Sequence, residues 1–365
     1  MRKGLMALLL VLAALTGTAA AAMPPVQSEA LDLDGLQAAG EQWAPGVDLE
    51  EGLDLEAGLQ SILDTGSGQV FGVVRKAVRS AVLLLTVVML CGLVESFQDA
   101  AGGEETGGLA AVVGAMAVAA IAITDANSLI GMGREALEHM QAFSKLLLPA
   151  VAAAAAAAGS PGGAAARHLA TMLFSDVLIT VITSLLLPLL YLYMAACVGH
   201  AALGNEGLKR VASAIKWAVT AALCAILLIF VGYLTVSGAV AGTADAAAVK
   251  AAKFAMSSVV PVVGGILSDA AETVLAGAGI LKNVVGVFGM LVVLGICLVP
   301  FLQLGIHYLA YKFTAALSAA GSGGRVAGLI DQIGGAFGLV LGMTGSCALL
   351  LLISMVSAVT AAAGG

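Results

Sequence analysis

Long apolar runs separated by short polar stretches dominate the chain after its first 77 residues. Crossing about 30 Å of hydrocarbon takes a helix of about 20 mostly apolar residues. Six runs are of this kind, near residues 78–98, 107–124, 168–198, 214–236, 284–311 and 336–361. The pattern therefore predicts an all-α polytopic membrane helical bundle of about six spans, within a range of six to eight.

Two further apolar segments, 145–158 and 258–281, are shorter, and each has a proline near its start. Each follows a polar stretch whose composition permits a helix. Interrupted segments occur at membrane depth only where they are buried in protein or line water. We therefore expect one or two interrupted or re-entrant segments in addition to the spans.

Two pairs of prolines recur at the same spacing. Pro149 and Pro261 are 112 residues apart, and so are Pro188 and Pro300. A basic loop and then a run of Cys-Ala followed by aliphatic residues come after Pro188, and the same order recurs after Pro300. This order predicts an internal repeat. Its two copies would have the same orientation in the membrane if both basic loops are cytoplasmic. The predicted copies are residues 140–236 and 252–360.

The amino-terminal residues have the pattern of a secretory signal peptide. Arg2 and Lys3 precede an apolar run at 5–15, and alanines occupy 20–22. The apolar run is shorter than the ~20 residues that a span needs, so we expect cleavage after residue 22 and not an uncleaved anchor.

Residues 23–74 carry ten acidic residues and no lysine or arginine. We predict a short acidic exported region that is weakly helical, ordered by a partner, or only a solvated spacer. The polytopic membrane domain then covers residues 75–365.

Composition narrows the class of protein. Apolar residues make up 60% of the chain and charged residues 11%, whereas soluble domains have about 25% charged residues. No segment of the sequence is basic enough to indicate nucleic-acid binding. The five cysteines form no C-x-x-C pair. Phosphate-binding loops, zinc-protease motifs and nucleophile elbows are absent from the sequence, so we expect no enzyme and no cofactor.

Candidate functional residues lie in the apolar, glycine-rich stretch 252–289. Asp269 and Glu272 are three residues apart and would share a helix face. Because a carboxylate at membrane depth costs about 2.5 kcal/mol or more, the pair indicates an ion or proton site, a helix cap or a water-exposed bend. Glu95 and His307 are better explained as interface residues. The other candidates for a pathway or subunit interface are Pro261, Gly264, Gly265, Lys282, Asn283 and Asp176.

Several polar and apolar residues in fixed order resemble the stage III sporulation protein AE family. The matching segments are A-K-F at 252–254, P-V-V-G at 261–264, S-D-A-A-E-T-V at 268–274, L-K-N-V-V-G-V-F-G at 281–289, P-F-L-Q-L at 300–304 and Y-K-F-T-A-A-L at 311–317. The resemblance also extends to the layout of a signal peptide, a short exported region and a polytopic body.

This resemblance implies a permease-like membrane subunit of a channel or secretion-like complex linking mother cell and forespore. Its implied partners are other membrane and ring-forming subunits, a separate cytosolic ATPase and the lipid bilayer, with no nucleic acid. Its implied location is the mother-cell membrane around the forespore, with the N-terminal region exported. The alternatives are a stand-alone proton- or Na⁺-coupled transporter and a non-transporting scaffold for ring-forming partners.

Overall fold

A computed structural model of the chain describes residues 33–43, 55–101, 107–157, 161–259, 264–321 and 324–360. Almost all of these residues are helical, and no strand occurs among them. In chain order the helices are α3 (Leu33–Trp43), α4 (Leu55–Ala101), α5 (Gly107–Ala157), α6 (Pro161–Val181), the π-helical turn η1 (Ile182–Leu186), α7 (Leu187–Leu203), α8 (Glu206–Val259), α9 (Gly264–Gly321) and α10 (Arg325–Thr360).

Six helical segments in the described residues are long and apolar enough to cross a membrane. They are Val70–Val94, Val112–Leu147, Leu173–Leu203, Glu206–Tyr233, Val284–Ala319 and Arg325–Ile353. Each overlaps one of the six predicted runs, in the predicted order. The prediction of an all-α polytopic bundle with about six spans is therefore confirmed.

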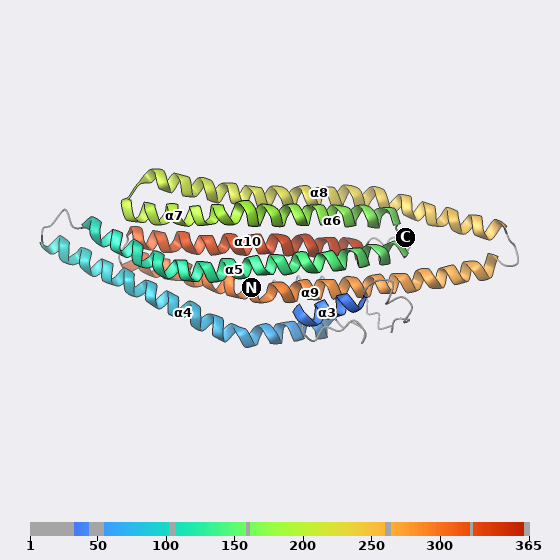
Figure 1. Ribbon diagram of the computed structural model, residues 1–365, viewed down its shortest axis with the longest axis horizontal. Coiled ribbons are helices and arrows are strands. Elements are labelled where there is room, and N and C mark those ends of the chain that lie inside the picture. Colours follow the sequence, from blue (N-terminus) through green and yellow to red (C-terminus); the bar gives the residue numbers. More distant parts are fainter. Residues whose placement is uncertain are drawn as a thin grey trace.

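The bundle is built from three long helical hairpins. α4 pairs with α5, the continuous α6–η1–α7 rod pairs with α8, and α9 pairs with α10. Figure 1 shows the helices running along the long axis, with α4 inclined to it, and the helix ends that each hairpin joins lie at one end of the bundle. The α4–α5 hairpin extends past the others at that end, and α8 and α9 extend past the others at the opposite end (Figure 1).

Helix α9 is the centre of the bundle. It packs against α4, α5, α8 and α10. In the most apolar 18-residue stretch of its span, 72% of the residues are buried, against 17% in the corresponding stretches of α4 and α8. Those two helices therefore form the edges of the bundle, and their outward faces carry exposed large apolar residues such as Val82, Met89, Trp217 and Leu228.

The turn between α7 and α8 is encoded locally. Gly204 ends α7 in the left-handed conformation, with φ 69° and ψ 17°, where a residue without Cβ is favoured. Its N–H donates to the carbonyl of His200 at 2.8 Å. The side chain of Asn205 then caps α8, because its Oδ1 accepts from the N–H of Gly207 at 2.8 Å.

Pro188 lies two residues after η1. A proline has no N–H and its ring crowds the carbonyl four residues earlier. The chain adapts by widening into a π turn, in which the N–H of Leu187 donates to the carbonyl of Ile182. The Thr183 hydroxyl donates to the carbonyl of Ile179 at 2.8 Å. The rod therefore continues past this proline.

The interruption predicted at 145–158 is not what the structure has. Pro149 lies inside α5, which is one helix from Gly107 to Ala157. The exposed proline points away from the core, while Leu147 and Ala150 are buried. Packing of the flanking residues therefore holds the helix together despite the missing hydrogen bond. At the second predicted interruption α8 ends at Val259 and α9 begins at Gly264, so Pro261 lies outside the described residues.

Part of the predicted acidic region is helical and packed on the membrane domain. α3 contacts α5 and α9, and Leu36 is buried there. The ring of Trp43 lies 5.6 Å from that of His139 and 5.9 Å from that of Phe143. Residue 74, the predicted end of this region, lies inside α4. The predicted signal peptide at 1–22 lies outside the described residues and stays a prediction.

Candidate functional site

The predicted acidic site lies in the first part of α9. The backbones of Asp269 and Glu272 are helical, at a spacing that places both on one face. Their side chains lie outside the described part of the structure, as do those of Lys282 and Asn283 and the surroundings of Gly264 and Gly265. A role for this segment in a pathway or an interface therefore stays a prediction.

Asp176 has a structural contact instead. It is exposed on α6, and its Oδ1 accepts a hydrogen bond from the Gln141 side-chain amide at 3.0 Å. This bond joins α6 to α5. Asp176 does not line the polar pocket described next.

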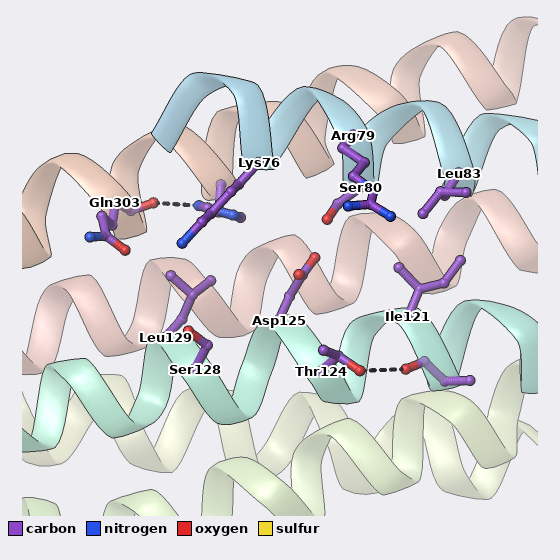
Figure 2. A pocket seen from close by; sticks show the side chains of 12 residues that line it. Lys76, Arg79, Ser80, Leu83, Ile121, Thr124, Asp125, Ser128, Leu129 and Gln303 are labelled. Carbon is purple, nitrogen blue, oxygen red and sulfur yellow. Dashed lines mark hydrogen bonds between the residues drawn. The ribbon is translucent and has the colours of Figure 1, made fainter. Parts of the chain in front are cut away.

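A polar pocket of about 490 Å³ lies between α4, α5 and α9. Figure 2 shows Lys76 and Arg79 extending from α4 toward α5, and Asp125 extending from α5 toward α4. Twelve residues from the three helices line it: Lys76, Arg79, Ser80, Leu83, Ala120, Ile121, Thr124, Asp125, Ser128, Leu129, Gln303 and His307. All of them lie within the candidate spans of their helices.

Helical spacing explains how each helix presents its polar residues. Lys76, Arg79 and Ser80 stand at positions i, i+3 and i+4, which share one face. Thr124, Asp125 and Ser128 lie within four residues of one another on α5, and Gln303 and His307 are four apart on α9. Each helix therefore contributes one polar strip, and the packing of α4 on α5 and α9 brings the three strips together.

A buried tyrosine holds the pocket's carboxylate in place. The hydroxyl of Tyr311 donates to Oδ2 of Asp125 at 2.7 Å. The Tyr311 ring is fully buried and packs edge-on against Phe337, with centroids 4.9 Å apart and an interplanar angle of 88°. Because the ring is buried and packed against Phe337, it restrains the Asp125 carboxylate on the α9 side of the pocket.

His307 is the most buried titratable side chain of the pocket, with 5% of its surface exposed. Its Nδ1 lies 2.8 Å from the carbonyl oxygen of Gln303. A carbonyl can only accept, so Nδ1 carries the proton in that bond. Nε2 is then left for the pocket, as an acceptor in the neutral ring and a donor in the charged one.

The pocket's cations exceed its anions. Neither Lys76 nor Arg79 forms an ion pair with a described residue, and Asp125 is the one carboxylate among the lining residues. Ion pairs between described side chains lie elsewhere, as in Arg134–Glu138, Lys209–Glu206 and Lys312–Asp331. Within the described residues no three His, Cys, Asp or Glu side chains gather as a metal site. The lining suits a polar or anionic group.

Most of this pocket lay beyond reasoning from the sequence. His307 stood out in its long apolar run, and the basic residues near the start of the first span can be read from the sequence, but nothing local joins them to Asp125. One signal was available: Lys76, Arg79 and Ser80 form a polar strip at helical spacing at the edge of an apolar run. That signal identifies a polar face of one helix, but it does not show which other helices pack against this face.

Comparisons with known proteins bear on the whole membrane body. A family model described as Stage III sporulation protein AE matches residues 50–364, which include every lining residue of the pocket. Stage III sporulation protein AE of Bacillus subtilis (strain 168) is 24% identical over 250 residues, covering 68% of this chain. The match spans 63% of the length of that relative. No solved structure matches the chain.

Proposed function

The chain belongs to the stage III sporulation protein AE family, and we propose that it is a permease-like membrane subunit of the channel complex linking mother cell and forespore. In this role it is an integral protein of the mother-cell membrane around the forespore, with its N-terminal region exported. Family membership and the six apolar helices support the membrane and sporulation parts of the proposal.

The polar pocket is the observation that carries the permease-like role. Charged groups inside apolar spans are expensive and are commonly found where ions or solutes pass. Here the charged groups come from α4 and α5, α9 adds the polar side chains of Gln303 and His307, and together they surround about 490 Å³ of space. A bundle that served only as a scaffold could fill the same position with apolar side chains at lower cost.

We further propose that energy and assembly come from other subunits. The sequence contains no phosphate-binding loop of the kind that holds ATP, which favours a separate cytosolic ATPase. Ring-forming proteins and further membrane subunits complete the proposed complex.

A proton-coupled secondary transporter is the second candidate. Asp125 and His307 line the same pocket, and such groups relay protons in transporters. Uptake driven by a proton gradient into liposomes that contain the purified protein alone would favour this candidate over the subunit role.

The proposed role predicts that the pocket's cations are needed for sporulation. In a sporulating host whose own copy is replaced, K76Q/R79Q should lower the yield of heat-resistant spores by about tenfold or more, because charge-assisted contacts to the passing group are lost. R75Q is the matched control, since Arg75 is exposed on the same helical turn but does not line the pocket. Full spore yield from K76Q/R79Q at normal membrane levels would refute the permease-like role of this pocket.

A further inference from the structure

We propose that the pocket between α4, α5 and α9 binds a phosphate group through Lys76 and Arg79. The inference deepens the proposed function by giving that site a ligand class, and its test uses purified protein without sporulation. The shared chemistry of the ligand is a tetrahedral anion of one or two negative charges, either free in water or as the head group of a phospholipid.

The charge balance of the pocket is the first argument. Lys76 and Arg79 bring two positive charges to walls that hold the single carboxylate of Asp125. That carboxylate is already restrained by Tyr311 at 2.7 Å. Both cations are exposed near the start of the span Val70–Val94, and neither has an ion pair to a described residue. An anion in the pocket would supply the missing counter-charge.

The neutral groups of the pocket are the second argument. The hydroxyls of Ser80 and Ser128 have no hydrogen bond to described residues, and the Gln303 side chain adds an amide donor. These donors stand on three helices around one space. Phosphate has oxygens pointing in several directions, so it can accept from Lys76 and Arg79 on α4 and from hydroxyl or amide groups opposite.

The surroundings of the pocket allow either source of the phosphate. Val78, Val82 and Leu83 are exposed apolar residues on the same helix as the two cations, and Leu83 lines the pocket. On an edge helix such residues face lipid, so a head group could enter from the side. Thr124 and Ser128 on α5 are exposed, so a free anion could enter past them. The probes below separate these sources.

The first measurement uses inorganic phosphate with the full-length protein in detergent. Isothermal titration at constant ionic strength should show saturable binding, with chloride as the reference anion. K76Q/R79Q should weaken phosphate binding by about tenfold or more, because charge-assisted hydrogen bonds are lost. R75Q should leave the affinity unchanged, because Arg75 carries the same charge on the same turn outside the pocket.

A second variant keeps the test informative if the double variant misfolds. D125N retains an oxygen that can accept from Tyr311 but removes the negative charge beside the site. It should strengthen phosphate binding by roughly threefold, since a nearby like charge is removed. A cation site would show the opposite sign.

The lipid measurement compares vesicles of phosphatidylglycerol, whose head group is a net anion, with vesicles of phosphatidylcholine, whose phosphate is neutralised by its own choline. Retention of phosphatidylglycerol by the purified wild-type protein, lost in K76Q/R79Q and kept in R75Q, identifies a head group as the source. Saturable binding of inorganic phosphate with the same pattern of variants identifies a free anion. Either result supports the inference.

The inference fails if the wild-type protein neither binds inorganic phosphate saturably nor prefers phosphatidylglycerol. It also fails if R75Q weakens binding as much as K76Q/R79Q, or if D125N weakens it. Loss of spores without phosphate binding would leave the proposed function standing and refute this ligand. Phosphate binding by the wild-type protein, together with full spore yield from K76Q/R79Q, would support this ligand and refute the permease-like role of the pocket.

Discussion

At the residue scale, one buried hydrogen bond organises the pocket. Tyr311 has no exposed surface, and its hydroxyl reaches Asp125 across the α5–α9 interface. A buried hydroxyl without a partner is costly, so the bond favours the observed packing of the two helices as well as the position of the carboxylate. The Tyr311 side chain thus contributes to the stability of the protein and also holds the charged group of the pocket in position.

We therefore predict that Y311F destabilises the protein by about 1–2 kcal/mol, the range expected for a hydrogen bond to a charged group within a membrane protein. The unfolding midpoint in a titration with SDS measures this change. Y308F is the matched control, because Tyr308 lies one turn away on α9 and its hydroxyl has no bond to a described residue. Equal effects of the two variants would refute the role of the Tyr311–Asp125 bond.

At the element scale, glycines of α10 receive the aromatic side chains of α9. A Cβ at Gly334 would lie 3.0 Å from Cβ of Tyr311, and one at Gly338 would lie 3.1 Å from the Tyr308 ring. Gly345 stands in the same relation to Phe301. Small residues let helices approach closely where no water is present to drive association. This strip of glycines explains how α9 can pack closely against α10.

The prediction at this scale concerns Gly334. G334V should separate α9 from α10 and destabilise the protein by about 1–3 kcal/mol, because overpacking forces the neighbouring backbone to shift. Three atoms close to the added group are Cβ of Tyr311, the amide nitrogen of Lys312 and the carbonyl of Tyr308, and none is the end of a flexible side chain.

The control for this variant is G342V on the same helix. A Cβ at Gly342 meets nothing within 4 Å, so the valine there should cost far less. Both variants are compared by their unfolding midpoints in SDS. A loss of stability at position 342 as large as at position 334 would show that valine itself, and not the interface, is responsible.

At the scale of the whole molecule, the three hairpins share one direction. The helix ends that each hairpin joins lie at one end of the bundle (Figure 1), and basic residues gather near two of these turns, including Lys209, Arg210 and Arg325. Two copies of a predicted repeat with the same orientation would have this arrangement. The repeat itself stays a prediction.

This arrangement predicts the result of cysteine mapping in intact membranes. After replacement of the five native cysteines, N205C and G324C should react with an impermeant maleimide from one side, and Q60C from the other. All three positions are exposed, and Gln60 precedes the first span while the other two lie at hairpin turns. Labelling of N205C and G324C from opposite sides would contradict the three-hairpin arrangement.

The sequence by itself determined the class of the protein and the order of its spans. The need for about 20 apolar residues per crossing is a local property, so runs such as 214–236 and 284–311 were sufficient to find α8 and α9. The turn at Gly204–Asn205 is local in the same way. The resemblance to a sporulation family also rested on short local segments.

Only the tertiary structure decided where these helices meet. Pro149 was expected to interrupt its segment, yet packing of Leu147 and Ala150 carries α5 through it. Lys76, Asp125 and His307 come together because α4 and α5 pack on α9, which no local pattern specifies. The polar pocket is therefore a property of helix packing, and a carboxylate or cation in an apolar run becomes a site only when another helix supplies its surroundings.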